Sequence, residues 1–200
     1  NLTAWVAGNE AVLSGLADEL ESQDSVAQAS IQPLVFSDYE INGQESDSEG
    51  QLVLYEPDRV PYRFFNGELS GYQEAPETIE PGTVYLPASM VSMYGASVGD
   101  TIDFSIARQG NGISLTVAGF FEDPFMGSSM IGMKSVLVSK ETLEEAGEIL
   151  AEAGIDSLAR EGGMIHITAA DPNMPAAELN RILYEETSLV SCTEFLYSAD

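Results

Sequence analysis

The sequence predicts an α+β protein in which the two ends of the chain form an α/β subdomain and a small β-rich subdomain is inserted between them. Three observations lead to this fold class: helix and strand patterns at both ends, short alternating strands between them, and enough apolar residues for a core. Of the 200 residues, 44% are hydrophobic, as in ordinary folded domains. We expect the α/β subdomain to comprise residues 1–79 and 139–200, and the inserted subdomain residues 80–138.

The N-terminal part of the chain is expected to form a strand, a helix and a second strand. The segment "LTAWVA" is the candidate first strand, and "GNEAVLSGLADELES" has the spacing of an amphipathic helix that Asn9 can cap. The apolar residues at helical spacing are Val12, Leu13, Leu16 and Leu20. A strand follows at residues 31–36, where Pro33 favours an edge position or a bulge.

Residues 37–82 carry weaker signals. Residues 37–50 are acidic and rich in turn formers, which predicts an exposed loop. Residues 51–56 predict a short strand. Residues 57–82 hold four of the nine prolines and little periodicity, so we expect an ordered connector there.

From residue 82 the pattern changes to short strands. "TVYL" is the first, and "TIDFSIA" follows with Ile102, Phe104 and Ile106 on one face. The segment "GISLTVAGFF" repeats the alternation. The glycine-containing "RQGNG" between these two strands predicts a hairpin loop. "KSVLVS" predicts a further strand.

The C-terminal part predicts a helix, a strand, a helix and a strand. The first helix starts at the cap Ser139 and ends at Gly154. Its inward residues are expected to be Leu143, Ala146, Ile149 and Leu150. "GMIHITAA" is the next strand, "MPAAELNRILYEE" the second helix with Leu179, Ile182 and Leu183 buried, and "SLVSCTEFLY" the closing strand.

The charge of the chain excludes one class of function and favours another. There are 33 Asp and Glu against 7 Lys and Arg, a net charge of −26. Such a field repels nucleic acid and anionic lipid and attracts cationic ligands, although solubility alone also accounts for an acidic surface. No apolar run reaches the roughly 18 residues that cross a bilayer. The chain starts at Asn1 without the layout of a signal peptide, which fits a piece of a longer membrane protein.

The sequence offers little catalytic chemistry. The one histidine, His166, lies in the strand "MIHIT", where we interpret it as an ordinary strand residue. Neither a GxSxG elbow nor a GxxxxGK[ST] phosphate loop occurs. Because Cys192 is the single cysteine of the sequence, an internal disulfide and a CxxC metal site are excluded. We interpret Cys192 as a small buried apolar residue. We therefore expect no enzyme, no catalytic residue, no cofactor and no metal; a hydrolase with an unrecognised carboxylate or Ser/His site is the alternative.

One segment partly matches a calcium-binding loop. Positions one, three, five, six and twelve of that template are occupied by Asp38, Glu40, Asn42, Gly43 and Glu49. Against calcium binding, position three is glutamate, position eight is the charged Glu45, and the flanks predict strands. The Asp38–Glu49 loop therefore stays open as a calcium site.

A soft apolar segment, "GFFEDPFMGSSMIGM", contains several methionines and phenylalanines. They are Met126, Met130, Met133, Phe120, Phe121 and Phe125. The segment either covers the core beside the hairpin or contacts a lipophilic ligand or partner.

The order of features between about residues 81 and 143 resembles the extracytoplasmic domain of FtsX-like, MacB-like ABC transporter permeases. The resemblance rests on "GTVYLPASMVSMYGASVGDTIDFSI", a hairpin, "ISLTVAGFFEDP" and "SVLVSKETLEE". In this family a strand ends in a Leu-Pro pair, a Gly-Asp pair precedes the next strand, and a Val-x-Gly strand is followed by an acidic residue. The matching residues are Leu86-Pro87, Gly99-Asp100, Val117-Ala118-Gly119 and Glu122-Asp123. At its turn, Asp100 is expected to make local hydrogen bonds.

The resemblance implies a non-catalytic domain on the extracytoplasmic side of the cell membrane, between two transmembrane helices of a permease. A cytoplasmic ATPase subunit would hydrolyse ATP, and the full-length permease would be a dimer. Other implied partners are an accessory protein or a cationic or lipophilic substrate, not nucleic acid. The domain would take part in export or couple ATP-driven motion to an extracytoplasmic partner. A secreted or cell-surface binding module, with no transporter attached, is the alternative function.

Overall fold

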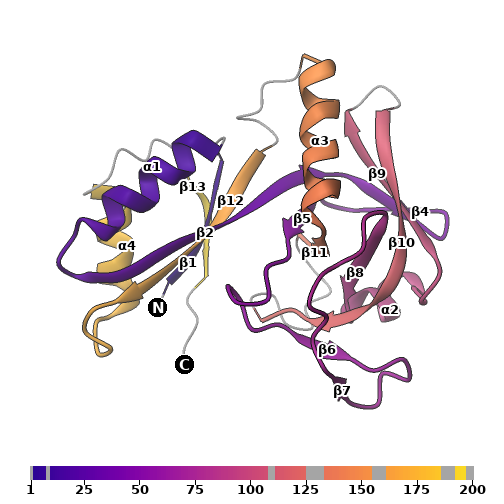
Figure 1. Cartoon of the computed structure of the whole chain (residues 1–200), viewed down its shortest axis with the longest axis horizontal. Helices are drawn as coiled ribbons and strands as arrows, with labels where there is room; N and C mark the ends of the chain where they lie inside the picture. The colour runs from indigo at the N-terminus through magenta and orange to yellow at the C-terminus, as the bar shows by residue number, and fades with distance from the viewer. Residues whose placement is uncertain are drawn as a thin grey trace. The chain divides into compact units, whose positions relative to one another are not determined.

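The computed structural model describes residues 2–7, 10–107, 111–124, 133–154, 161–185 and 192–196, and it confirms the α+β class. The described part of the chain contains four α-helices and a mixed β-sheet (Figure 1). The chain divides into two compact units. Unit 1 comprises Asn1–Pro33 and Ser157–Asp200, and unit 2 comprises Leu34–Asp156.

Unit 2, the inserted part, is longer than the predicted inserted subdomain of residues 80–138. The reason is that β5 (Gly50–Leu54) pairs with β11 (Ser135–Val138), and the core around them includes side chains of the following helix. Residues 34–79 and 139–156, which flank the predicted insert, are therefore part of the same compact unit as the insert. The subdomain limits 79/80 and 138/139 stay a prediction alongside these compact units.

Unit 1 has a β-α-β-β-α-β order. Its elements are β1 (Leu2–Ala7), α1 (Glu10–Glu21), the first part of β2 (Val26–Ser37), β12 (Glu161–Ala169), α4 (Ala176–Glu185) and β13 (Cys192–Leu196). The strand order is β13-β1-β12-β2, and β1 runs antiparallel to both of its neighbours. This combination of element order and strand order is the ferredoxin-like arrangement, with unit 2 inserted between its second and third strands.

One face of the unit 1 sheet packs against both helices. Alternate residues of a strand point to the same face. The buried cluster residues of β1 and β12 follow that period, whereas those of β2, Val26 and Ala29, are three residues apart. The buried cluster contains Leu2, Ala4, Val6, Val26, Ala29, Ile165 and Ile167 from the strands and Leu13, Leu16, Leu20, Leu179, Ile182 and Leu183 from the helices. The predicted helical stripes are thus confirmed except at Val12, which is 52% exposed. Asn9, the expected cap, lies outside the described residues.

Strand β2 is longer than predicted and passes from one unit into the other. Its first part lies beside β12 at the edge of the unit 1 sheet, and residues 34–37 pair antiparallel with β5. Pro33 lies where the strand changes partner. Proline has no N–H to give to a ladder, and the printed pairing with β5 begins only at Leu34. Because β2 has a neighbouring strand on each side in the sheet order, the expected edge position or bulge at Pro33 stays a prediction.

Unit 2 contains most of the strands. Besides β5, β11 and the end of β2, its elements are β3 (Tyr39–Ile41), β4 (Gln44–Glu45), β6 (Arg63–Phe65), β7 (Tyr72–Gln73), β8 (Thr83–Pro87), α2 (Ser89–Tyr94), β9 (Thr101–Ala107), β10 (Asn111–Glu122) and α3 (Lys140–Glu152). The order is β5-β11-β8-β10-β9-β3-β4, and β6 pairs with the end of β10 and with β7. Only the β5–β11 and β8–β10 pairs in this path are parallel among the registers described.

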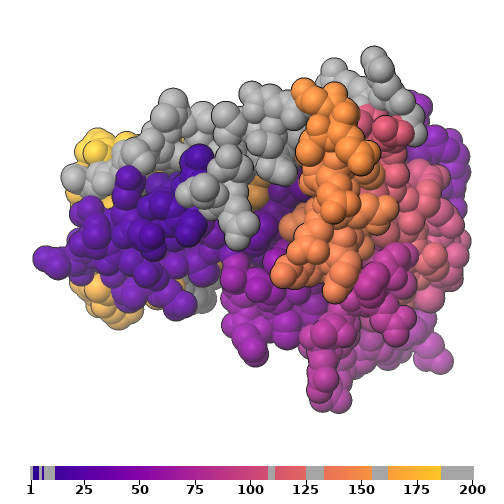
Figure 2. Space-filling model, turned by 45° about the horizontal axis from the view of Figure 1, so that its top comes forward, coloured from indigo at the N-terminus to yellow at the C-terminus, as the bar shows by residue number. Residues whose placement is uncertain are grey.

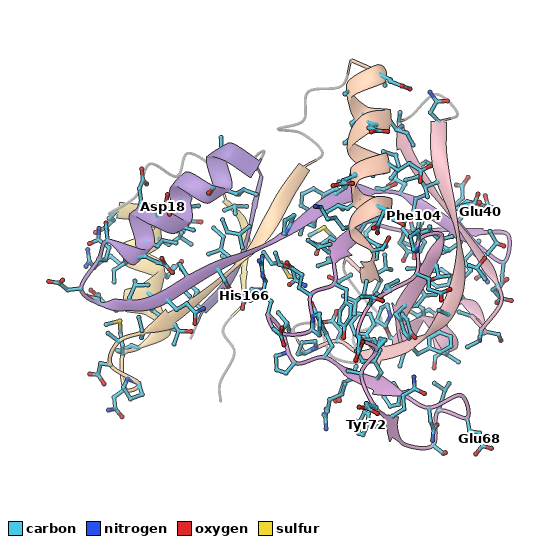
Figure 3. All side chains as sticks on the ribbon, viewed as in Figure 1. Asp18, Glu40, Glu68, Tyr72, Phe104 and His166 are labelled. Carbon is cyan, nitrogen blue, oxygen red and sulfur yellow. The ribbon has the colours of Figure 1, made fainter. Side chains whose placement is uncertain are left out.

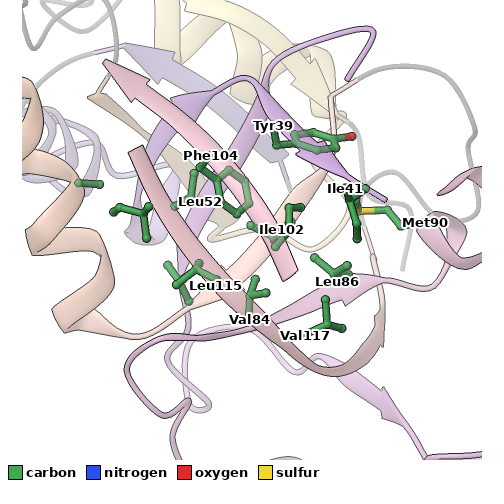
Figure 4. Packing of buried hydrophobic residues seen from close by; sticks show 14 of the residues in the cluster. Tyr39, Ile41, Leu52, Val84, Leu86, Met90, Ile102, Phe104, Leu115 and Val117 are labelled. Carbon is green, nitrogen blue, oxygen red and sulfur yellow. The ribbon is translucent and has the colours of Figure 1, made fainter. Parts of the chain in front are cut away.

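The core of unit 2 forms from the inward faces of these strands. Ile102, Phe104 and Ile106 of β9 are at most 1% exposed, as the alternation predicted. Figure 4 shows Phe104 and Ile102 among Leu52, Val84, Leu86, Leu115 and Val117. Helix α3 adds Ala146 and Leu150 to this core, while its other side faces outward (orange in Figure 2).

The predicted limits of α3 are confirmed. The Ser139 hydroxyl accepts the N–H of Thr142 at 3.2 Å, the bond expected of an N-cap. Gly154 follows the helix at φ 66°, a left-handed conformation that glycine adopts without steric cost.

Two predictions for residues 37–82 were wrong. The segment 37–50 is not a simple loop, because it contains β3 and β4, and the connector 57–82 contains β6 and β7. These strands are only two or three residues long, so they show no measurable alternation.

Glycine 119, in the Val117-Ala118-Gly119 motif, allows β10 to lie close to β8. A β-carbon at this position would lie 2.7 Å from Cε1 of Tyr85. The Tyr85 ring packs edge-on against Phe64, with the centroids 5.0 Å apart, so it has little room to move. The register between β8 and β10 also shifts between Val117 and Gly119.

We predict that Gly119→Ala lowers the free energy of unfolding by about 1–3 kcal/mol, because the methyl group overpacks this contact. Tyr85→Leu in the same chain should recover part of the loss, since it removes the crowded ring atoms. Urea unfolding of the two single variants and the double variant measures the coupling. An unchanged midpoint for Gly119→Ala would show that the strands separate freely.

Candidate functional site

His166 joins three strands of unit 1 by hydrogen bonds. Its Nδ1 lies 3.1 Å from the Thr3 hydroxyl on β1, and its Nε2 lies 3.1 Å from Gln32 Oε1 on β2. An amide oxygen only accepts hydrogen bonds, so the arrangement fits the neutral tautomer of His166 that carries its proton on Nε2. In that tautomer Nε2–H donates to Gln32 Oε1, and Nδ1 accepts from the Thr3 hydroxyl. Thr3 is 4% exposed and Gln32 is fully buried. The Thr3 hydroxyl is thus shielded, and the partner on the other nitrogen is an amide rather than the carboxylate of a catalytic triad.

The candidate calcium segment is a β-hairpin. β3 and β4 pair antiparallel, with Glu40 opposite Glu45 and Ile41 opposite Gln44. Asn42 and Gly43 form the two-residue turn at φ 53° and 73°, as in a type I′ turn. Ligand positions three, five and six of the template therefore lie on a strand and in a tight turn, not in a loop that wraps an ion.

The Asn42 side chain holds the turn that the sequence singled out at Gly99-Asp100. Its Nδ2 donates to the Tyr94 carbonyl at 3.2 Å and to Asp100 Oδ2 at 3.1 Å. The same Asp100 oxygen accepts the Ser97 N–H at 2.9 Å. The expected local role of Asp100 is confirmed, and it extends to the hairpin 58 residues earlier.

Three carboxylates form a row across the exposed face of neighbouring strands. Glu45 lies opposite Glu40 on β3, and Glu40 lies opposite Asp103 on β9. Asp103 accepts a hydrogen bond from Ser114 of β10. Within the described part of the chain, no group of three or more His, Cys, Asp or Glu has the geometry to hold a metal ion.

A buried polar group lies at the start of β11. Lys134 is 2% exposed and Asp123 3% exposed. Burial lowers the pKa of the Lys134 ammonium, and the negative charge of Asp123 opposes this effect. Beside them, the Ser135 hydroxyl donates to Gln51 Oε1 at 3.1 Å. Sequence reasoning missed this lysine, which stands at the start of an otherwise apolar strand.

The β6–β7 hairpin, residues 63–73, is an exposed feature of unit 2 that the sequence did not predict. Its base is fixed by Phe64, which is fully buried and pairs with Phe121 of β10. The Phe64 ring also contacts Tyr55, Tyr85 and Phe121, with centroid distances of 5.5, 5.0 and 6.4 Å. In the sequence, the only indications of this hairpin are the aromatic residues next to glycine in "FFNG" and "SGY".

The Tyr72 side chain on this hairpin is in contact with three other side chains. The Arg63 guanidinium lies 4.6 Å from the centroid of the Tyr72 ring, and the Phe65 ring lies 5.0 Å from it. The Tyr72 hydroxyl donates to Glu122 Oε2 at 2.9 Å, and Arg63 forms an ion pair with the same oxygen. The hydrogen bond to Glu122 raises the pKa of Tyr72. Arg63, Tyr72 and Glu122 thus form one exposed polar and aromatic cluster.

The Glu122-Asp123 motif therefore has two different environments. Glu122 binds the exposed hairpin, whereas Asp123 is buried near Lys134. Alternation along an extended strand places consecutive side chains on opposite faces, which accounts for this division.

The apolar segment 119–133 is only partly described. Phe120 and Phe121 are buried in β10, which favours a role in the core. Met133 Sδ accepts from Gln51 Nε2 at 3.7 Å. Phe125, Met126 and Met130 lie outside the described residues, as does the side chain of Cys192 on β13.

The helices that the structure describes are all too short or too polar to cross a bilayer.

Comparison with known proteins gives matches only among solved structures. No protein-family profile and no curated sequence matches the chain. The periplasmic region of MacB from Actinobacillus actinomycetemcomitans is 13% identical, with a TM-score of 0.43, and the match covers 92% of this chain and 80% of that one. The extracellular domain of the noncanonic ABC-type transporter YknZ from Gram-positive bacteria is 9% identical, with a TM-score of 0.44, and the match covers 99% and 100%.

A third structure is a domain of a putative permease protein from Porphyromonas gingivalis. It is 14% identical, with a TM-score of 0.41, and the match covers 92% of this chain and 77% of that one.

We predict that the Asn42 side chain and its backbone contribute separately to stability. Asn42→Gly keeps the positive φ but removes the bonds to Tyr94 and Asp100, at a cost of about 1–3 kcal/mol. Asn42→Ala should cost about 1 kcal/mol more, because alanine is strained at this φ. Urea unfolding of both variants measures the difference. Equal stability of Asn42→Gly and the parent chain would show that the amide bonds contribute nothing.

We predict a pH-dependent effect of Lys134→Met. Because the folded-state pKa of Lys134 lies below its ordinary 10.5, the unfolded chain binds more protons between the two values, and stability of the parent chain rises with pH there. Lys134→Met should be at least as stable as the parent at pH 7, and this advantage should shrink as pH approaches 10.5.

The matched control is Lys140→Met, since Lys140 is exposed and pairs only across one helical turn with Glu144. Its stability difference should stay flat over the same pH range, because exposed pairs contribute little. A loss of more than about 2 kcal/mol in Lys134→Met at pH 7 would show that attraction to Asp123 outweighs desolvation.

Proposed function

We propose that this chain is a non-catalytic extracytoplasmic domain of an ABC transporter permease. The observation that carries the proposal is the pairing of the first and last strands. Thr3 on β1 lies opposite Leu196 on β13 in antiparallel register. Residues near the two ends are therefore neighbours in one sheet, as required of a domain inserted between two successive membrane-spanning segments.

The inserted part supports the same proposal from the sequence side. The motif residues of the resemblance have defined structural roles: Pro87 ends β8, Asp100 organises the turn before β9, and Gly119 allows β10 to approach β8. These roles belong to the scaffold of the domain. The single histidine is engaged with Thr3 and Gln32, which supports a non-catalytic role.

In this proposal a cytoplasmic ATPase subunit supplies the energy, and a pair of permease chains forms the transporter. Motion of the membrane segments would enter unit 1 through its terminal strands, since β1 and β13 lie side by side. The domain would then transmit that motion to a substrate or an accessory protein outside the membrane. The field of a chain with net charge −26 favours cationic partners there.

The decisive experiment is site-specific labelling of the full-length protein in intact cells. The reading frame should continue into apolar helices on both sides of residues 1–200. With Cys192 replaced by serine, a single cysteine at Val98, which is 56% exposed, should react with a membrane-impermeant maleimide without lysis. A cysteine at the fully buried Leu86 is the matched control and should react only after denaturation.

Reaction of the Val98 position only after cell lysis would overturn the proposed location. A reading frame with one signal peptide and no spanning helix would instead identify a secreted binding module. Co-purification of the full-length protein with an ATPase subunit, and loss of that subunit when the spanning helices are deleted, would support the transporter assignment.

A further inference from the structure

The β6–β7 hairpin exposes large apolar groups on a very acidic protein. Tyr72 is 50% exposed and Leu69 is 38% exposed. Tyr72 is the first residue of β7, and Leu69 lies next to Glu68 in the loop that connects β6 and β7. Figure 3 shows Tyr72 and Glu68 on this hairpin. Apolar and aromatic groups presented together are typical of binding surfaces, where tyrosine and arginine are enriched.

Tyr72 is held in one orientation before any partner binds. Its hydroxyl donates a hydrogen bond to Glu122. Its ring contacts the Phe65 ring and the Arg63 guanidinium. The strand that carries Arg63 is anchored in turn by the buried Phe64. A side chain that is already ordered loses less entropy on binding.

Leu69 is presented by a loop in a strained conformation. Its φ is 56°, which is unusual for a branched side chain. The Leu69 N–H donates to the Asn66 carbonyl at 2.9 Å, and the Asn66 side chain accepts the Ser70 N–H at 3.0 Å. These bonds maintain the conformation. Strain that is retained at an exposed position points to a function of that position.

The charge of the surface indicates the kind of partner. Residues 64–80 contain four glutamates, all exposed, and no lysine or arginine. Arg63 beside them is paired with Glu122. A second copy of this chain, with its charge of −26, would be repelled, whereas a basic partner would be attracted and steered to the surface.

We propose that Leu69 and Tyr72 of the β6–β7 hairpin form the docking surface for a protein partner that presents apolar side chains next to lysine or arginine. Leu69 and the exposed edge of Tyr72 would contact the partner's apolar groups, and Glu68 and Glu74 its cations. The location of this partner outside the membrane rests on the proposed function; the binding surface itself does not.

The test uses the 200-residue chain and a fluorescent twelve-residue peptide of alternating lysine and leucine. Fluorescence anisotropy at about 0.15 M salt, where long-range attraction is screened, gives the Kd. Leu69→Asn and Tyr72→Ser should each weaken binding about tenfold, as expected when a central contact of an interface is removed. A peptide of alternating glutamate and leucine should not bind.

Two matched controls carry the same substitutions at exposed apolar positions elsewhere. Val98→Asn and Tyr184→Ser replace side chains that are 56% and 43% exposed, and each should change the Kd less than twofold. Asparagine tolerates positive φ, so Leu69→Asn should keep the fold, and urea unfolding checks this. A spin-labelled peptide should broaden amide signals of residues 66–72 more than those of residues 95–100.

Equal weakening by all four substitutions, or by none, would overturn the proposal, because the peptide would then bind the acidic surface in general. Self-association of the chain that Tyr72→Ser abolishes would also overturn it in favour of a second copy. Since these measurements use the isolated chain, their failure leaves the cell-labelling result intact. A failure of the labelling experiment would in turn change the compartment of the partner but not the binding surface.

Discussion

The antiparallel pairing of β1 with β12 on one side and β13 on the other is the constraint on which the structure depends. β1 comes from the start of the chain and its two partners from the end, so unit 1 forms only when both ends are present. The entropy cost of closing the intervening segment grows slowly with its length. A segment as long as unit 2 can therefore be inserted, provided that it folds around its own core, as the cluster around Phe104 does.

The sequence predicted the elements whose apolar pattern is long and regular. Ile102, Phe104 and Ile106 alternate over a whole strand, and Ser139 and Gly154 mark both ends of a long helix, so these positions agree with the structure. The short strands β3, β4, β6 and β7 were not predicted, because two or three residues cannot show a period. Their pairing depends on partners far along the chain, such as Phe121 opposite Phe64.

The candidate site was the least predictable part for the same reason. Nothing near Tyr72 in the sequence indicates that Glu122, fifty residues later, accepts a hydrogen bond from its hydroxyl. The calcium template, by contrast, matched in spacing but failed in backbone geometry, since Asn42 and Gly43 close a two-residue turn. Asp100 was predictable as a turn residue, but its bond to Asn42 was not. Local chemistry could be inferred from the sequence, whereas contacts across the sheet could not.

The carboxylate row of Glu45, Glu40 and Asp103 costs stability, since like charges opposite one another on paired strands repel. The row lies at the edge of the unit 2 sheet, which ends in the two-residue strand β4. An exposed edge offers unpaired N–H and C=O groups to any other extended chain, and very short, charged edge strands prevent such additions. The repulsion that weakens this edge therefore also protects the protein from aggregation through it.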